Sequence, residues 1–556
     1  MEKRTLIAFV LALSVLFLWE MLVSSKYSWF RPSDTQPVKT APVEEKVAQE
    51  SLPPIKPVLP GVLPDAHAAP AEALQQNWTI ETPFYQTQIV SSGARLRSFK
   101  LDKYRVSVDP NSALMELIPT QSSGYLPLAL DLIAHPGWEF ATRPFQSSAQ
   151  QSTPMNLGKT EQNVDFWSEV PGQVKITKTF SFHPDAYFTD VTIELQNLGT
   201  EPLEDQLGIS FYFQPFAAVG QEDSYNKSRM AVCQNSSVKE LDSKDIAKKP
   251  LSFAPPLNWI GYENNYFLQA VVPIEGGGYQ IVPKMLDDTT GLLQVVYLTE
   301  PFQIQSGQQK SFKLRLYLGP KELSQLNAAG YDLARAADYG WFDFLARPLL
   351  YVLKWFYKYT LNYGVAIILL TVVIKILFWP LTHKSYKSMQ AMKKLQPKMA
   401  KLREKHKDNR EKLNEETMAL YRAHKVNPLG GCLPMVLQIP VFFALYRMLY
   451  SSVDLLHQPF AFWINDLTAP DRLGIGFQLP YLGAGLPVLT LLMGASMFIQ
   501  QKMTPTTGDP RQEKMMLMMP VVFTVFFINF PSGLVLYWLV NNVLSIVQQY
   551  LINRQA

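Results

Sequence analysis

Residues 515–551 read MMLMMPVVFTVFFINFPSGLVLYWLVNNVLSIVQQYL and contain no charged side chain. A tight turn at Pro531-Ser532-Gly533 divides them into two apolar segments, 515–530 and 533–551. Each segment approaches the ~20 residues that a helix needs to cross a ~30 Å hydrocarbon layer. The stretch therefore predicts a pair of transmembrane helices. It excludes a single soluble globule, a disordered chain and a collagen-like fibre.

Similar apolar runs predict four more spans, which makes this a polytopic α-helical membrane protein with six transmembrane helices. Three of them are 361–381, 429–450 and 480–500. The fourth is an N-terminal anchor over 1–23, because Lys3 and Arg4 precede an apolar run. A cleaved secretory signal is the alternative for that run, although its cleavage site is weak.

Loop charge predicts how the spans are oriented. Residues 383–427 hold 13 Lys and Arg against 5 Asp and Glu, whereas 451–480 holds one Arg and three Asp. Cytoplasmic loops carry the excess of Lys and Arg. The segment 382–428, the loop 501–514 and both termini are therefore expected in the cytoplasm. Cys233 and Cys432 fall on opposite sides in this arrangement, which forbids a disulfide between them.

The chain outside the membrane divides into a spacer and a β-rich domain. Nine prolines lie between Arg31 and Pro70, so we expect an extended spacer over 24–77. From 78 to 340 apolar and polar residues alternate, as at Val191, Ile193 and Leu195. This period of two predicts half-buried strands and one large antiparallel β-sandwich outside the membrane.

Two amphipathic segments flank the span 361–381. The charged residues of 341–359 share one helical face among many aromatics, which predicts a helix lying in the membrane interface. A core-facing helix of the sandwich is the alternative. In the segment 382–428, apolar residues at helical spacing predict a basic two-helix hairpin. Either their stripe only packs the two helices together, or the hairpin also contacts anionic lipid or RNA.

Motifs of catalysis are missing from the sequence. It has no phosphate-binding loop of the Walker type, no Gly-x-Ser-x-Gly, no His-Glu-x-x-His and no pair of cysteines at metal-binding spacing. We therefore expect no enzyme, cofactor or metal. His135 and His183 with scattered carboxylates leave a sugar-converting site in the outer domain as a weak alternative.

Polar side chains inside predicted spans are the candidate functional residues. Lys375 lies six residues before the end of its span, where insertion costs ~2.5–3.5 kcal/mol, and Thr371 is one turn away. The last span carries a polar stripe at helical spacing, formed by Tyr537, Asn541, Ser545 and Gln548. Lys375 either snorkels to the interface or faces the stripe across a wet groove. The alternative for the stripe is hydrogen bonding between helices.

Four short motifs carry a resemblance to a known family. They are Leu395-Gln396-Pro397-Lys398, Asn427-Pro428-Leu429-Gly430-Gly431-Cys432, Phe523-Thr524-Val525-Phe526-Phe527 and Phe530-Pro531-Ser532-Gly533-Leu534. These segments resemble the YidC/Oxa family of membrane protein insertases, densely over 341–551. The anchor, spacer and outer domain resemble the Gram-negative layout, whose periplasmic domain is an all-β supersandwich of the sugar-mutarotase type.

The resemblance implies a five-helix insertase core around a cationic hydrophilic groove, open to cytoplasm and lipid. Lys375 matches the basic residue of that groove, where the family usually has Arg, so the charge is kept and the bidentate fork is lost. Thr371 and Trp538 match groove positions of the family by motif. Gln438 is assigned to the groove by aligning the motif that ends at Cys432. Tyr537, Asn541 and Ser545 complete the expected substrate groove.

The implied function is that of an insertase and chaperone, which inserts, folds and helps assemble inner-membrane proteins, alone or with the Sec translocon. Nascent inner-membrane proteins are its expected partners. The Sec translocon is a further candidate, as are the ribosome and anionic lipids through 383–427. A small-solute transporter with a sugar-binding outer domain is the alternative. Lys375 as a lone intramembrane cation and the lack of an internal repeat disfavour it.

Overall fold

The computed structural model describes residues 63–69, 77–149, 154–158, 160–216, 226–248, 251–276, 278–406, 409–424, 426, 433–475, 485–504 and 510–554. The predicted anchor, 1–23, and the parts 24–62 and 70–76 of the predicted spacer lie outside these ranges. Cys432 also lies outside them, and Cys233 is buried in a strand.

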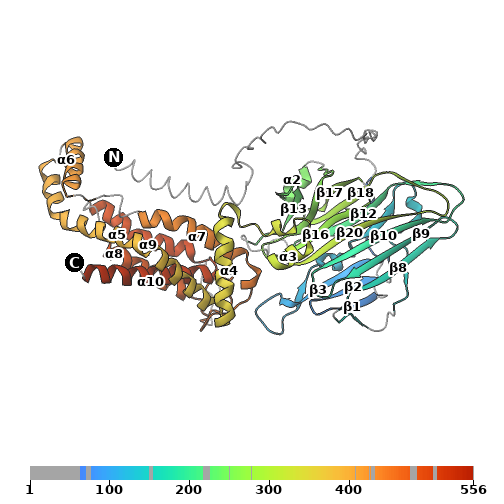
Figure 1. Ribbon diagram of the computed structural model, residues 1–556, viewed down its shortest axis with the longest axis horizontal. Helices are drawn as coiled ribbons and strands as arrows, with labels where there is room; N and C mark the ends of the chain where they lie inside the picture. Colours follow the sequence, from blue (N-terminus) through green and yellow to red (C-terminus); the bar gives the residue numbers. More distant parts are fainter. Residues whose placement is uncertain are drawn as a thin grey trace, which may run out of the picture. The chain divides into compact units, whose positions relative to one another are not determined.

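The C-terminal region is a bundle of helices (Figure 1). Its members are α4 (Asp343–Thr360), α5 (Tyr363–Lys405), α6 (Arg410–Ala423), α7 (Leu433–Ser451), α8 (Val488–Met503), α9 (Pro510–Phe527) and α10 (Ser532–Arg554). The last helix, α10, packs against both α5 and α8, while α9 packs on α8 and α4 packs on α5 and α7. This arrangement places the polar residues of α10 against two different neighbours.

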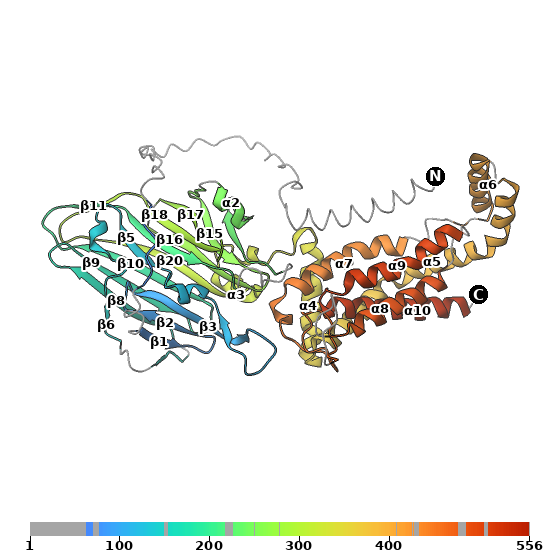
Figure 2. The ribbon, with the colours of Figure 1, turned by 180° about the vertical axis from the view of Figure 1, so that it is seen from behind.

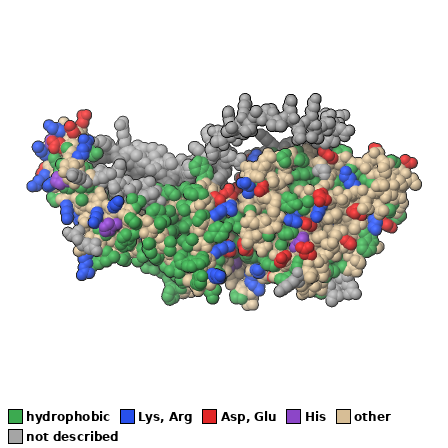
Figure 3. Space-filling view, viewed as in Figure 1, with side chains coloured by type: hydrophobic (Ala, Val, Ile, Leu, Met, Phe, Trp, Pro, Cys, Tyr) green, Lys and Arg blue, Asp and Glu red, His purple; other side chains and the backbone are tan. Residues whose placement is uncertain are grey.

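Apolar side chains cover the outside of the bundle as well as its interior. Met448, Met493 and Val535 are buried in the core. Leu377 on α5 and Val525 on α9 are 74% and 65% exposed, and Figure 3 shows a broad hydrophobic surface over these helices. A bundle that is apolar on its outer surface suits lipid as its solvent.

Two described helices, α5 and α10, are long and apolar enough to cross a membrane, and the apolar part of α9, Lys514–Phe527, is shorter. The predicted number of six spans is therefore not established by the structure. Helix α4 packs on the bundle through Ala346, Leu350 and Leu353 and exposes Phe344, Tyr351 and Trp355.

Three predicted boundaries differ from the structure. The predicted span 361–381 and the first helix of the predicted hairpin form one continuous helix, because α5 continues through Pro380 with Thr382, Ser385 and Met389 buried on it. Helix α8 begins at Val488 and not at 480, since Leu486 instead pairs through its backbone with Leu473. Helix α9 ends at Phe527 and not at 530, where a turn precedes Pro531.

The β-rich domain holds four sheets, and Figure 2 shows the central strands of the largest side by side. Its nine strands, in spatial order, are β14 (Ser237–Leu241), β13 (Arg229–Gln234), β15 (Leu257–Glu263), β16 (Phe267–Glu275), β20 (Gln309–Pro320), β10 (Phe188–Asn197), β9 (Val174–Phe182), β8 (Gln162–Val170) and β6 (Gln146–Ser147). The predicted alternation is confirmed on β10, where Val191, Ile193 and Leu195 are buried.

The other sheets and short helices complete this domain. The four-stranded sheet is β17 (Tyr279–Asp287), β18 (Leu292–Thr299), β12 (Leu207–Phe213) and β5 (Ala129–Leu132). The five-stranded sheet is β4 (Leu114–Glu116), β3 (Arg95–Arg105), β2 (Tyr85–Val90), β1 (Asn77–Glu81) and β7 (Met155–Asn156), and β11 (Leu203–Asp205) pairs with β19 (Phe302–Ile304). The helices are α2 (Ser243–Lys248) and α3 (Leu323–Ala329). The domain is not entirely antiparallel, because the short β7 runs parallel to β1.

The predicted spacer is also too long. Residues 63–69 belong to the folded β-rich domain, where Ala68 pairs antiparallel with Tyr125 and Ala69 is buried. The three alanines of this segment, Ala66, Ala68 and Ala69, allow its backbone to lie close to the domain, which the count of prolines does not reveal.

Candidate functional site

Lys375 on α5 points toward α10. Its Nζ donates a hydrogen bond of 2.7 Å to Ser545 Oγ, and Ser545 in turn donates to the backbone oxygen of Asn541 at 2.8 Å. The ammonium is partly buried, and no described Asp or Glu lies within 4.0 Å of it. The snorkelling alternative is not what this geometry shows, since a hydroxyl of a neighbouring helix holds the charge. A positive charge without a carboxylate partner is thus kept between two apolar helices.

A second bond joins the same two helices. Gln548 Nε2 donates to Thr382 Oγ1 at 2.8 Å, and both side chains are buried. Hydrogen bonding between helices, which the sequence left open for the polar stripe, is therefore present at Ser545 and Gln548. Asn541 Oδ1 is buried and has no hydrogen-bond partner within the described ranges. The site thus offers one cation and one unused acceptor.

Gln438 and Tyr537 form a separate polar contact. Gln438 Nε2 of α7 donates to the Tyr537 hydroxyl, and Tyr537 is 2% exposed. Its neighbour Trp538 lies among aromatic rings, 4.8 Å from Phe442 and 5.0 Å from Phe527 between ring centroids. The tyrosine and glutamine thus join α7 to α10, whereas Trp538 contributes an apolar wall.

Thr371 and Lys375 share a helical face, but the Thr371 hydroxyl bonds within its own helix and not to Lys375. That hydroxyl donates to the Ile367 oxygen one turn earlier at 2.7 Å, and the side chain is buried. A threonine that bonds its own helix in this way satisfies its polar group without a partner helix.

The polar stripe predicted for the last span leaves out a second polar face of α10. Asn542 Nδ2 donates to Ser496 Oγ of α8 at 3.0 Å, and Gln549 Nε2 donates to the Met503 oxygen at 2.8 Å. Asn542 and Gln549 are two turns apart, so their spacing was a usable signal. Asn542 and Gln549 do not belong to the predicted stripe, because they face α8 while the stripe residues Ser545 and Gln548 face α5.

A loop between α7 and α8 forms hydrogen bonds with the N-terminal ends of α5 and α10. The amides of Ser532 and Gly533, which open α10, donate to Ala469 and Leu467, and Asn362 before α5 donates to Phe460. These loop contacts hold α5 and α10 at one end, so the Lys375–Ser545 pair is positioned by the fold.

The basic hairpin packs its own helices together. Leu395 and Met399 of α5 form a cluster with Tyr421 of α6, and Lys398 Nζ lies 2.9 Å from His424 Nε2. Figure 3 shows Lys and Arg side chains gathered at the α6 end of the bundle. The stripe of the hairpin is thus used for packing, while its charges remain on the surface.

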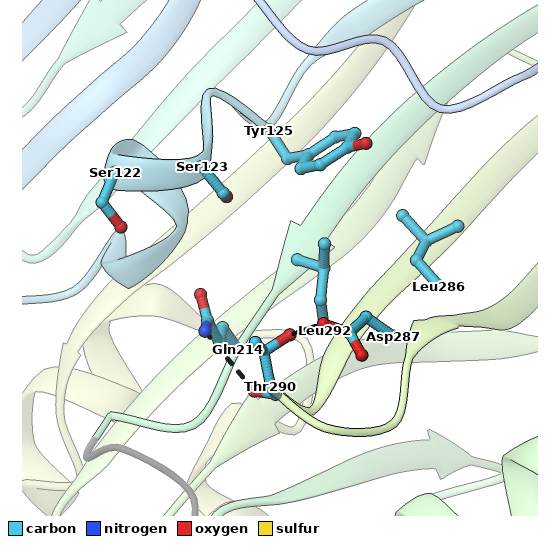
Figure 4. Close-up of a pocket in the computed structure, with 8 residues that line it drawn as sticks. All are labelled: Ser122, Ser123, Tyr125, Gln214, Leu286, Asp287, Thr290 and Leu292. Atoms are coloured by element: carbon cyan, nitrogen blue, oxygen red, sulfur yellow. Dashed lines mark hydrogen bonds between the residues drawn. The ribbon is translucent and has the colours of Figure 1, made fainter.

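The two histidines of the weak sugar-converting alternative each lie within hydrogen-bonding distance of a different carboxylate. His135 Nδ1 is 2.7 Å from Asp205, and His183 Nδ1 is 2.8 Å from Glu161. Neither lines the pocket of about 400 Å³ shown in Figure 4. That pocket is lined by Ser122, Ser123, Tyr125, Gln214, Leu286, Asp287, Thr290 and Leu292. Over the described residues, no group of three His, Cys, Asp or Glu could hold a metal ion.

Comparison with known proteins covers nearly the whole chain. Residues 77–352 match the family described as YidC periplasmic domain, and residues 355–556 match the family described as 60Kd inner membrane protein. Membrane protein insertase YidC of Syntrophobacter fumaroxidans is 56% identical, with 100% of both chains aligned. The insertase of the same name from Pelobacter propionicus is 41% identical over 100% of this chain and 99% of its own.

A crystal structure of an active YidC insertase aligns with 85% of this chain and 92% of its own at 19% identity, with a TM-score of 0.36. The full-length relatives establish the relationship by sequence. Their identity exceeds what is needed to assign a family over the β-rich region and the helical bundle alike. The chain therefore belongs to the YidC family of membrane protein insertases.

Proposed function

We propose that this chain inserts membrane proteins by receiving a short hydrophilic segment at the Lys375–Ser545 site while the adjoining hydrophobic segment enters lipid sideways. The observation that supports this is the cation of Lys375, whose partner is a hydroxyl and which has no carboxylate partner in the described part of the chain. An opposite charge at 4 Å gains ~4 kcal/mol at an effective dielectric near 20. This is similar to the ~2.5–3.5 kcal/mol that a carboxylate costs at the centre of a span.

The substrate groove of this proposal combines the groups that the fold distributes over α5, α7 and α10. Lys375 supplies charge, and Asn541 supplies a buried acceptor. Gln438, Tyr537 and Ser545 supply polar contacts that a substrate can exchange for its own. Thr371 and Trp538 shape the wall. No catalytic reaction and no cofactor are part of this proposal.

The same proposal includes six spans, cytoplasmic termini and a periplasmic β-rich domain in the bacterial inner membrane. The charge of the loop 383–427 supports this orientation. Nascent inner-membrane proteins are the proposed substrates, which the chain also helps to fold and assemble. We further propose contacts of the hairpin with the ribosome or anionic lipids, and cooperation with the Sec translocon. The transporter alternative gains no support from relatives that are named insertases.

Reconstitution tests the proposal directly. A single-span protein with a short acidic tail is synthesised in vitro beside liposomes that hold the purified chain, and insertion is read as protection from protease. We expect protection with the chain and little with empty liposomes. Equal protection in both would contradict the proposal, and uptake of a labelled sugar without insertion would favour the transporter.

A further inference from the structure

We propose that the β-rich domain carries a binding site for an extended peptide, and that the chain's own residues 63–69 occupy it as a displaceable clasp. We call this segment the clasp. The inference is independent of the insertase function, because it concerns the β-rich domain and its connection to the N-terminal part of the chain.

The site contacts the amide, the carbonyl and the imidazole of one clasp residue, His67. Its amide donates to the Tyr212 hydroxyl at 3.1 Å, and its carbonyl accepts from Arg95 Nη1 at 2.8 Å. Its imidazole Nε2 lies 3.1 Å from Asp131 Oδ1. Two of these contacts are made to the backbone of His67 and one is made to its side chain. The geometry therefore suits an extended peptide with a histidine at the centre.

The groups that hold His67 are prearranged by the domain. Arg95 is fully buried, and its guanidinium also donates to the Ser92 oxygen at 3.1 Å, which fixes its direction. Gln294 is fully buried, donates to Ser210 Oγ at 3.1 Å and reaches the Pro64 oxygen of the clasp at 3.5 Å. Gln294 Oε1 and Asp131 Oδ2 are buried and have no hydrogen-bond partner among the residues that the structure describes. Unused acceptors beside a bound peptide indicate a site that can form further contacts.

The surface under the clasp is shaped for small residues. Ala69 donates its amide to the Gly124 oxygen at 2.8 Å and is buried beside Val90 and Leu126. A Cβ on Gly124 would stand 3.3 Å from the Ala69 oxygen, and Gly124 has a φ of +76°. Ala66 and Tyr125 pack against the same small hydrophobic cluster, and Tyr125 also lines the pocket of Figure 4. Alanines at these positions thus allow the backbone to approach the domain.

Two features make the clasp displaceable. It is a seven-residue segment whose ordering costs conformational entropy, and that cost offsets much of what a few hydrogen bonds contribute. It also stands at the end of the predicted spacer. Release of the clasp therefore lengthens the connection to the domain by its own seven residues, about 23 Å of extended chain.

Charge around His67 predicts the pH dependence of the clasp. Asp131 raises the pKa of His67 through their hydrogen bond, against burial and the charge of Arg95, and Asp65 raises it further. The buried Lys178, whose Nζ donates to the Leu128 oxygen at 2.6 Å, is a further titratable group beside Arg95 and Asp131, and burial lowers its pKa. Because the bound pKa is raised, the contribution of the ion pair is complete below about pH 6.5 and is lost as pH rises through the bound pKa.

The test uses the full-length chain in detergent with the fluorescent peptide GVLPDAHAAPAE, the sequence of residues 61–72. In an open-site variant, residues 63–69 are replaced by Gly and Ser at equal length. We expect saturable binding, tighter at pH 6 than at pH 8.5. The affinity should fall about tenfold or more when the peptide carries His67→Ala. The unmodified chain should bind less, because its own clasp competes. Asp131→Asn in the open-site chain should remove the pH dependence, whereas the exposed Asp185→Asn should not.

Hydrogen exchange gives a second measurement that does not depend on the replacement. In the full chain with His67→Ala alone, the Ala69 amide should exchange at least about tenfold faster. A scrambled peptide that binds as well as the native one, or an unchanged exchange rate at Ala69, would overturn the clasp. Neither result would bear on membrane insertion.

Discussion

The Lys375 ammonium of α5 donates to the Ser545 hydroxyl of α10 at 2.7 Å, between residues 170 positions apart in the chain. A hydroxyl can accept this bond without neutralising the charge. The fold therefore satisfies the geometry of the lysine and leaves its charge available. This relationship carries the proposed function and determines which substitutions are informative.

The first prediction concerns the charge of Lys375. Lys375→Arg should keep insertion of substrates with acidic tails, because Arg preserves the charge and adds donors. Lys375→Ala should impair substrates with one or two tail carboxylates about tenfold, and spare those with none, since a neutral tail has no Coulomb attraction to lose. Insertion of matched substrates into liposomes, read by protease protection, measures the difference.

Lys384→Ala is the matched control, because Lys384 lies on the same helix and is exposed. It should leave insertion of all tails unchanged. Equal losses for neutral and acidic tails in the Lys375→Ala variant, at unchanged abundance, would argue that Lys375 has no electrostatic role.

A second prediction concerns the bond between α10 and α8. Asn542 donates to Ser496 at 3.0 Å, and both side chains are buried. A double-mutant cycle with Asn542→Ala and Ser496→Ala should give a coupling of about 0.6 kcal/mol, the average for such bonds in membrane proteins. Reversible unfolding in mixed micelles measures it. A coupling indistinguishable from zero would show that these side chains do not stabilise the bundle as a pair.

The close approach of α8 and α9 supplies a third prediction. A Cβ on Gly494 would lie 2.0 Å from Thr524 Oγ1, and that hydroxyl already donates to the Pro520 oxygen. Gly494→Ala should therefore destabilise the bundle by about 1–3 kcal/mol through overpacking. Thermal unfolding in detergent measures the loss. Thr524→Ala combined with Gly494→Ala should recover part of it, and no recovery would place the strain elsewhere.

The last prediction concerns acid stability of the β-rich domain. Asp190 lies opposite Arg315 on neighbouring strands and accepts two bonds from it, at 2.7 and 3.0 Å. Burial raises the pKa of Asp190, but the nearby His183, 3.7 Å away, and the hydrogen bonds and charge of Arg315 outweigh burial and lower the pKa to about 2. Because this pKa is lowered, the stabilisation is complete above about pH 4 and is lost as pH falls toward 2, by about 2 kcal/mol.

Amide exchange on β10 and β20 at pH 5 and pH 2.5 measures that loss in the full chain. Asp190→Asn should remove this part of the pH dependence and lower stability at neutral pH. The exposed Glu201→Gln serves as control and should keep the dependence. A pH dependence that survives Asp190→Asn would assign the acid sensitivity to other carboxylates.

Local sequence patterns are enough to predict a lipid-embedded helical part and a separate β-rich domain. The uncharged stretch from Met515 to Leu551 requires an apolar environment for α9 and α10, because so much apolar surface is stable only out of water. The alternation at Val191, Ile193 and Leu195 likewise determined strands, since a period of two puts every second side chain on one face. Both inferences depend on residues near one another in the chain.

The hydrogen bonds between polar side chains of different helices depend on how the helices pack. Helical spacing places Asn541, Ser545 and Gln548 on one side of α10, but it does not tell which helix covers that side, or that α8 covers Asn542. Packing also directed Trp538 into an aromatic cluster and His67 onto the β-rich domain. The physical reason is that local periodicity fixes only the direction of a side chain relative to its own helix or strand, whereas a partner is chosen by packing between segments far apart in sequence.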